Sequence, residues 1–219
     1  MNYAIIVASG SGKRMGQVLP KQFSLLAGKP LLAHVLKAFS SSSFNPKIIL
    51  VLNAEHVSIW KEHVLSFDID IPHQIVIGGA ERFHSVKNGI EALDGDGLVA
   101  IHDGARPLIK AKTIDRLFKA AAEFGNAIPV IPAAESVRYQ GKPIDRSQIT
   151  IIQTPQLFKL STLKEAYKQE FDVSFTDDAT LVEKAGITLN LVEGQQGNIK
   201  VTYPEDLKIA ETLLDNFNS

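Results

Sequence analysis

The sequence contains no cysteine, and its 23 basic residues nearly balance its 24 acidic residues. Without cysteine the chain can form no disulfide, no thiolate zinc site and no cysteine nucleophile. The balanced charge argues against nucleic acid or a membrane surface as a partner, because such binding depends on an excess of basic residues. The apolar run in MNYAIIVASGSG lacks a basic leader and is too short for a signal sequence or a membrane span. We therefore expect a cytoplasmic protein in which any anion site is a local cluster of cations.

Short apolar runs recur along the first 131 residues and predict strands. They are nearly continuous rather than alternating, which is typical of strands covered on both faces: YAIIVA (3–8), KIILVL (47–52), HQIVIG (73–78), GLVAIH (97–102) and NAIPVI (126–131). Helical patterns lie between them, as in the apolar face of Leu32, Val35, Leu36 and Phe39. The alternation predicts a single α/β domain over residues 1–219, with a mainly parallel sheet, helices on both faces and right-handed crossovers.

The alternation of strand and helix stops near residue 133. Residues 133–153 read as two extended segments around a Gly-Pro turn, and so few residues cannot form a core of their own. We expect a projecting β-hairpin arm, which is a common device for dimerisation. Helices are predicted near 162–171 and from Thr176, a strand near 187–194, and a last helix after TYPEDL. Thr202 and Glu205 have the spacing of a capping box, with Pro204 in the first turn of that helix.

Three polar stretches begin where a predicted strand ends: SGSGKRMG after the first strand, GGAERFHS after the third and HDGARP after the fourth. In open parallel sheets ligands bind outside the carboxyl ends of the strands. Dozens of residues separate these stretches along the chain, but this topology gathers them at one edge. We therefore expect all three to form one site.

The first polar stretch, with the residues after it, is SGSGKRMGQVLPKQF (9–23), and it fits neither of the two best-known phosphate loops. A Walker A loop needs a glycine where Val7 stands and a hydroxyl residue where Arg14 stands. The dinucleotide fingerprint fails because Met15 occupies the third glycine position. The remaining interpretation is a glycine loop whose backbone N–H groups approach a phosphate, with Arg14 and Lys21 as the cations.

Six motifs in this order resemble the 2-C-methyl-D-erythritol 4-phosphate cytidylyltransferase family: ASGSGKRM with PKQ, GGAERFHSV, HDGARP, QTPQ, TDDA and NIKVTYPEDL. The resemblance runs from about residue 3 to 214. It implies a Rossmann-like fold and a β-arm that interlocks a homodimer with shared active sites. It also implies a reaction in which CTP and methylerythritol phosphate give a CDP-alcohol and pyrophosphate, through Mg²⁺-assisted in-line attack on the α-phosphorus.

The resemblance also assigns the residues around CTP. Arg14 and Lys21 match positions that stabilise the transition state, with Lys21 near the α-phosphate. The backbone of Ala8, Ser9, Gly10 and Gly12 would hold the triphosphate, while Lys13 is interpreted as solvated. In the second motif, Gly79 and Ser85 match positions that line the cytosine pocket. Arg82 either touches a phosphate or braces this loop, and Ala80, acidic in some relatives, is assigned no contact.

Asp103 is the best metal-ligand candidate, because a carboxylate at a strand end suits Mg²⁺ that is also bound by phosphates. Asp103 is also assigned to the residues that surround the second substrate, methylerythritol phosphate. Arg106 would bind that substrate's phosphate or order Asp103, and Thr154 and Thr176 match positions that hold methylerythritol phosphate. Lys200 and Arg146 match catalytic positions that contact it, Arg146 from the partner's arm. His102 is interpreted as a packed histidine. Three acids are interpreted as residues of the first turn of a helix: Glu81, Asp177 and Asp178.

Two alternatives stay open on the sequence. Ribitol 5-phosphate cytidylyltransferases carry out the same chemistry on a longer alditol, although HDGARP and TDDATL favour methylerythritol phosphate. A non-catalytic nucleotide-binding module would also keep the fold, but it would be expected to lose cations or Asp103, and both are present.

Overall fold

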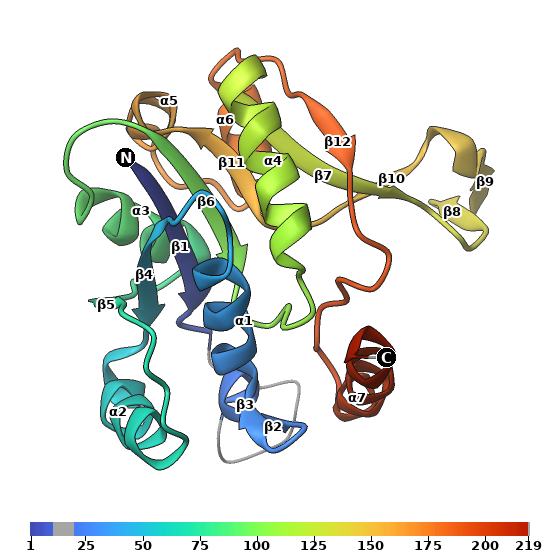
Figure 1. Ribbon diagram of the computed structural model, residues 1–219. Coiled ribbons are helices and arrows are strands. Elements are labelled where there is room, and N and C mark those ends of the chain that lie inside the picture. Colours follow the sequence, from blue (N-terminus) through green and yellow to red (C-terminus); the bar gives the residue numbers. More distant parts are fainter. Residues whose placement is uncertain (11–19, 219) are drawn as a thin grey trace.

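The computed structural model describes residues 1–10 and 20–218, and its centre is an eight-stranded, mostly parallel sheet (Figure 1). β1 (Asn2–Ala8) pairs in parallel with β4 (Lys47–Leu52) on one side and β6 (Leu98–Asp103) on the other, and β5 (Gln74–Ile77) continues the sheet beyond β4. β11 (Gln156–Lys159) runs antiparallel between β6 and β7 (Asn126–Pro132). β12 (Leu191–Glu193) is a parallel partner of β7. The predicted strands and the α/β class are confirmed.

Helices cover both faces of this sheet because both sets of alternating strand side chains are apolar. In β1, Ala4 and Ile6 belong to one core cluster, whereas Tyr3 and Ile5 belong to the other. The first cluster is covered by α1 (Leu31–Ser40), α2 (Val57–Ser66), which follows the short helix η3 (Ala54–His56), and α4 (Ala111–Phe124). The second is covered by α3 (Arg82–Glu91), α5 (Leu160–Ala166) and α6 (Asp178–Lys184).

The strand register brings the loops after β1, β5 and β6 to the same edge. Val7 pairs with Asp103, Ala8 with Leu52, and Leu52 with Ile77, so these strands end side by side. Gly104 N–H donates to Val7 C=O at 2.9 Å, which ties the end of β6 to the end of β1. The expected convergence at one edge is confirmed for the second and third polar stretches and for Ser9 and Gly10 of the first; the rest of the first stretch lies outside the described residues.

The segment after β7 only partly matches the predicted arm. β8 (Val137–Tyr139) and β9 (Lys142–Ile144) form a hairpin that projects away from the sheet (Figure 1). Its turn is Gln140-Gly141, where φ is +49° and +78°, so the predicted Gly-Pro turn was wrong and Pro143 lies within β9. β10 (Thr150–Ile152), after the short helix η4 (Arg146–Gln148), pairs antiparallel with the end of β7. That part of the predicted arm therefore extends the main sheet.

The C-terminal helices match the predicted patterns in part. α5 begins at Leu160 and ends at Ala166, before the predicted end near residue 171, whereas α7 (Pro204–Asn218) has Pro204 in its first turn, as the capping-box pattern predicts. The Asp206 carboxylate accepts from the N–H groups of Thr202 at 2.7 Å and Tyr203 at 2.9 Å, so Asp206 performs the capping role that the spacing assigned to Glu205. The helix packs beside the small hairpin of β2 (Leu25–Leu26) and β3 (Lys29–Pro30). Within the described residues, every helix is too short or too polar to cross a membrane.

Candidate active site

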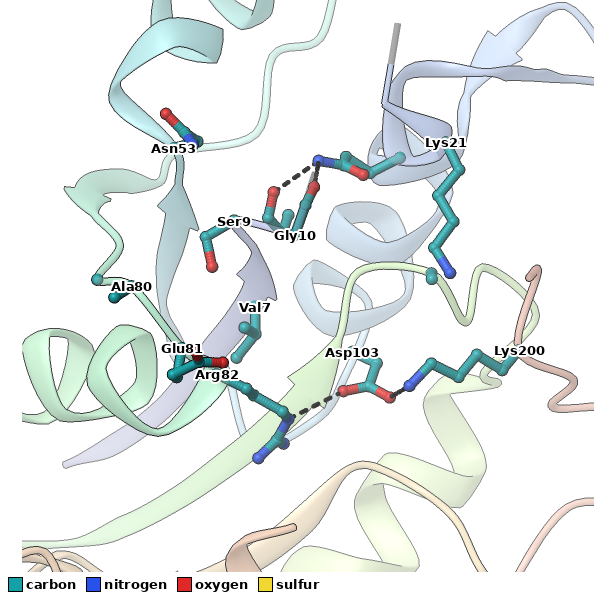
Figure 2. Close-up of a pocket in the computed structure, with 14 residues that line it drawn as sticks. Val7, Ser9, Gly10, Lys21, Asn53, Ala80, Glu81, Arg82, Asp103 and Lys200 are labelled. Carbon is teal, nitrogen blue, oxygen red and sulfur yellow. Dashed lines mark hydrogen bonds and ion pairs between the residues drawn. The ribbon is translucent and has the colours of Figure 1, made fainter. Parts of the chain in front are cut away.

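A cavity of about 530 Å³ opens at the carboxyl edge of the sheet. Its lining comes from the end of β1, the short helix η2 (Lys21–Phe23), the loop between β5 and α3, the end of β6 and Lys200 near the C-terminus. Figure 2 shows Lys21, Lys200 and Asp103 towards one end, and Ser9, Ala80 and Asn53 towards the other. Among the described residues, the cavity thus has one cation-rich end, the charged end, and a second end, the Ser9 end, whose one charged side chain is Glu81.

The end of β1 is held by Gln22, a buried residue of η2. Its side-chain Nε2 donates to the Ala8 carbonyl at 2.7 Å and to the Gly10 carbonyl at 3.2 Å (Figure 2). Both ends of this short stretch are therefore fixed by one amide group. The motif PKQ contains Gln22, but no role was predicted for this residue from the sequence.

Ser85 lies behind the Ser9 end, in the first turns of α3, and its side chain is fully buried. Its hydroxyl accepts from Ser9 Oγ at 2.7 Å and from Gly79 N–H at 3.1 Å, and it donates to the Glu81 carbonyl at 3.1 Å. The hydroxyl predicted to line the cytosine pocket is thus bonded within the protein. Ser9, which is only partly buried, lines the cavity in front of it.

Asp103 is surrounded by cations. Its Oδ2 lies 2.8 Å from Lys200 Nζ and 3.8 Å from Arg106 Nε, and its Oδ1 lies 3.5 Å from Arg82 Nε. Burial alone would raise the pKa of Asp103, but the charges of Arg82, Lys200 and Arg106 outweigh it and hold that pKa well below its usual range. The carboxylate is therefore ionised at neutral pH and orients the cations around it.

Arg82 connects Asp103 to a second, fully buried carboxylate. Its guanidinium donates Nη1 to Asp178 Oδ1 at 3.0 Å and Nη2 to Asp178 Oδ2 at 2.6 Å. The hydroxyl of Tyr167 donates to the same Asp178 Oδ1 at 2.5 Å. Asp178 does lie in the first turn of α6, but it serves as an ion-pair partner inside the protein rather than as a solvated helix acid.

The end of β6 is fixed by a chain of hydrogen bonds through His102. Asp103 N–H donates to Thr154 Oγ1 at 3.1 Å, and that hydroxyl lies 3.1 Å from His102 Nδ1. His102 Nε2 lies 3.1 Å from the Arg106 carbonyl, which can only accept, so Nε2 carries the proton and Nδ1 accepts from Thr154. Burial lowers the pKa of His102 to about 4, which keeps the ring neutral at pH 7. The interpretation of His102 as a packed histidine agrees with these contacts.

This arrangement joins partly exposed cations, a strand-end carboxylate and the residues Ser9 and Gly10 at one cavity. A model of the 2-C-methyl-D-erythritol 4-phosphate cytidylyltransferase family matches residues 2–216. The chain belongs to this family. Its fold and the six motifs are thereby those of a cytidylyltransferase.

Similar proteins support the assignment along the whole chain. The 2-C-methyl-D-erythritol 4-phosphate cytidylyltransferase of Bacteroides fragilis is 46% identical, over 96% of this chain and 98% of its own. That of Geobacillus kaustophilus is 40% identical, over 98% of this chain and 97% of its own. The crystal structure of 4-diphosphocytidyl-2C-methyl-D-erythritol synthase from Anaerococcus prevotii, 28% identical, superposes with a TM-score of 0.82 over 98% of this chain and 96% of its own.

Several of the residues expected from the family resemblance line the cavity: Ala8, Ser9, Gly10, Lys21, Gly79, Arg82, Asp103 and Lys200. Gly12 and Arg14 lie outside the described residues. Arg106 is directed at the Asn198 carbonyl, to which its Nη1 donates at 2.9 Å, and it stands beside Asp103. The contact with Asp103 supports the predicted role of Arg106 in ordering that carboxylate, whereas a contact of Arg106 with a substrate phosphate stays a prediction.

Three predicted substrate contacts do not line this cavity. The Thr154 hydroxyl is buried and bonded as described above, and Thr176 is exposed just before Asp177, the residue that caps α6. Arg146 lies beside the projecting hairpin, exposed, with Nη1 donating to the Ala134 carbonyl at 3.0 Å. Their roles towards methylerythritol phosphate stay predictions.

Proposed function

We propose that this chain transfers CMP from CTP to 2-C-methyl-D-erythritol 4-phosphate and releases pyrophosphate. The observation that carries the proposal is the cavity itself, where Lys21, Lys200 and Arg82 meet at the carboxyl edge of the sheet in a member of this family. The three cations around Asp103 and the two carboxylates, Asp103 and Asp178, leave one net positive charge at the charged end, and Lys21 adds another, while the Glu81 carboxylate lies at the other end. Such a site favours phosphates.

The chemistry needs no protein nucleophile. A phosphate oxygen of the alditol phosphate attacks the α-phosphorus of CTP, a P–O bond forms, and the bond to the bridging oxygen of pyrophosphate breaks. The attacking phosphate is largely ionised near neutral pH, so no general base is required. The barrier lies in bringing two anions together, and catalysis rests on positioning and on electrostatic stabilisation. His102 is consistent with a reaction that needs no general base, because its neutral ring is buried and both of its nitrogens have protein partners.

The cations have distinct parts in this proposal. Lys21, at the charged end, meets negative charge at the α-phosphate. Lys200 is positioned by Asp103 and meets the incoming phosphate, since its Nζ is only 2.8 Å from that carboxylate. Positions fixed before the substrates bind cost little reorganisation during the reaction.

We include Mg²⁺ in the proposal, because one carboxylate of the cavity, that of Asp103, is suited to bind it. Mg²⁺ takes one or two protein carboxylates together with phosphate oxygens and waters. Among the described residues, Asp103 is the one Asp or Glu at the charged end of the cavity. Its Oδ1 lies 3.5 Å from Arg82 Nε, whereas its Oδ2 lies 2.8 Å from Lys200 Nζ. Within the described residues there is no group of three or more His, Cys, Asp and Glu side chains suited to a metal. Asp103 would thus supply a single ligand, and Mg²⁺ would reduce the charge on the phosphates.

We further propose a homodimer in which the β8–β9 hairpin and η4 bring Arg146 to the partner's site. The support is that Arg146 is exposed on a projecting segment and does not line the cavity of its own chain. Tyr139, on the same hairpin, is 65% exposed and would pack against the second copy.

We place the reaction in the cytoplasm, because CTP and alditol phosphates are highly charged and do not cross membranes unaided.

Release of pyrophosphate tests the activity. The enzyme is assayed with CTP and Mg²⁺ and with either methylerythritol phosphate or ribitol 5-phosphate. We expect turnover with the first and little with the second. Faster turnover with ribitol 5-phosphate would contradict the proposed substrate, and CTP binding without turnover of either would support a non-catalytic module.

A further inference from the structure

The Ser9 end of the cavity, which holds no cation among the described residues, is the place for the base of the nucleotide. The charged end holds Lys21, Asp103 and Lys200, which suit phosphates, whereas the other end is formed by the backbone of 79–80 and by Ser9, Asn53 and Glu81, with no cation among the described residues (Figure 2). A nucleoside triphosphate that lies along the cavity therefore brings its base to Ser9. This step, like the inference below, rests on the proposed function.

The loop at this end is tightly packed, so its polar atoms have fixed positions. A Cβ atom at Gly78 would lie 2.5 Å from Ser9 Cβ, and one at Gly79 would lie 2.3 Å from His84 Cβ. Both glycines therefore permit a backbone approach that no other residue allows. The close contact between Gly78 and Ser9 sets the distance between the loop and Ser9, which therefore does not depend on a ligand.

The hydroxyl of Ser85 determines which way the Ser9 hydroxyl points. A hydroxyl group has one hydrogen and two lone pairs. The Ser85 hydrogen is donated to the Glu81 carbonyl at 3.1 Å, and its two lone pairs accept from Gly79 N–H at 3.1 Å and from Ser9 at 2.7 Å. In this arrangement the Ser9–Ser85 bond uses the hydrogen of Ser9. With this hydrogen directed inward, Ser9 Oγ keeps only lone pairs for the cavity.

We propose that Ser9 Oγ selects cytosine over uracil by accepting a hydrogen bond from the 4-amino group. Cytosine carries a donor at position 4, whereas uracil carries a carbonyl oxygen there, which would face the lone pairs of Ser9. A serine hydroxyl that could rotate would accept either base, so the discrimination depends on Ser85. Ala80, the neighbour on the loop, has no polar side-chain atom to share this role. Ser9 is thus a specificity-determining residue, beyond the backbone contact predicted from the sequence.

The test combines a substitution with a change in the nucleotide. Binding of CTP and of its analogue without the 4-amino group (2-pyrimidinone ribonucleoside triphosphate) is measured by calorimetry for the parent enzyme and for Ser9→Ala. We expect Ser9→Ala to weaken CTP binding about tenfold, the worth of one hydrogen bond, and to leave binding of the analogue unchanged. Equal losses for both nucleotides would overturn the proposal.

Two further variants test the mechanism of the discrimination. Ser85→Ala frees the Ser9 hydrogen, so we expect UTP to bind more tightly and the preference for CTP over UTP to fall about tenfold. An unchanged preference would contradict the locking role of Ser85. Glu81→Gln is the matched control, because Glu81 also lines the cavity and its carboxylate is the other acceptor near the base. We expect it to keep the difference between CTP and the analogue; loss of that difference would assign the amino group to Glu81 and overturn the role of Ser9.

These binding measurements stay separate from the proposed reaction. If pyrophosphate release with methylerythritol phosphate fails while Ser9→Ala still affects CTP alone, the substrate is wrong and the base contact stands. If turnover proceeds and the two nucleotides lose affinity equally, the base contact is wrong and the reaction stands. Thermal unfolding of each variant shows that the fold is kept.

Discussion

Arg82 and Asp178 form a bidentate ion pair across 96 residues of sequence, at 3.0 and 2.6 Å, while Arg82 Nε remains 3.5 Å from Asp103. Burial acts to lower the pKa of Arg82, but Asp178 and then Asp103 outweigh it and raise that pKa above its usual value. The guanidinium is thus fixed from behind by Asp178. Only its Nε edge faces Asp103, which limits how far Arg82 can move towards a phosphate.

The first prediction concerns the stability of this pair. Asp178→Asn leaves the Arg82 charge without its buried partner, so we expect the free energy of unfolding to fall by roughly 3–5 kcal/mol. Tyr167→Phe removes one hydrogen bond to the carboxylate and keeps the ring that stacks on Phe83, so a loss of about 1.5–3 kcal/mol is expected. Urea unfolding measures both.

Tyr203→Phe is the control for the Tyr167 variant. Tyr203 is 54% exposed, and removing an exposed hydroxyl should change the free energy of unfolding by less than about 0.5 kcal/mol. A stable Asp178→Asn variant would show that Arg82 does not depend on the pair.

The strands and the site edge could be predicted from the sequence, whereas this ion pair could not. Nearly continuous apolar runs identify strands because a strand covered on both faces leaves no room for polar residues. Asp178 reads as a helix acid because nothing local shows that Arg82 lies beside it. β11 was missed for a similar reason, since its four residues carry no period and its position between β6 and β7 depends on long-range pairing.

The second prediction tests Lys200. Lys200→Ala removes the cation nearest to Asp103, and we expect kcat/KM for methylerythritol phosphate to fall roughly 10²-fold, as for loss of a charge contact in the transition state. Thermal stability should change little, because the Lys200 side chain is 41% exposed. Lys168→Ala is the matched control, since it breaks an equally short ion pair, 2.6 Å from Glu165, on the exposed surface. Equal activities of the two variants would exclude Lys200 from the site.

The third prediction concerns Lys21. Lys21→Ala should lower kcat at least roughly 10²-fold, because its charge is used at the α-phosphate in the transition state. Steady-state rates of pyrophosphate release at saturating CTP measure the effect, and circular dichroism confirms the fold. An almost unchanged kcat would mean that the loop after β1 does not hold the reacting phosphate.

The fourth prediction tests the shared site. Arg146→Ala should raise KM for methylerythritol phosphate more than KM for CTP. An equal mixture of Arg146→Ala and Lys21→Ala chains, refolded together, should recover about one quarter of the parent activity, because half of the dimers are mixed and each holds one intact site. Mixed dimers purified with two different tags and found inactive would show that Arg146 does not act in the partner.

The last prediction is a pH dependence of stability through His102. Burial lowers its pKa to about 4 in the folded protein, from an ordinary value of 6.5. Between these values the unfolded chain binds a proton that the folded chain does not, so the free energy of unfolding falls as the pH falls. From pH 7 to pH 5 the contribution of His102 is about 2 kcal/mol.

Urea unfolding at these two pH values, for the parent and for His102→Gln, isolates this contribution. The lowered pKa values of His34 and His63, both caused mainly by burial, act in the same direction in both proteins and cancel in the comparison. The pKa of Asp103 lies below its usual range, so its effect appears only at more acid pH. We expect the pH dependence of His102→Gln to be weaker by about 2 kcal/mol over this interval. Equal dependence in both proteins would mean that His102 takes up a proton in the folded state and that the hydrogen-bond chain from Asp103 N–H to the Arg106 carbonyl tolerates a charged ring.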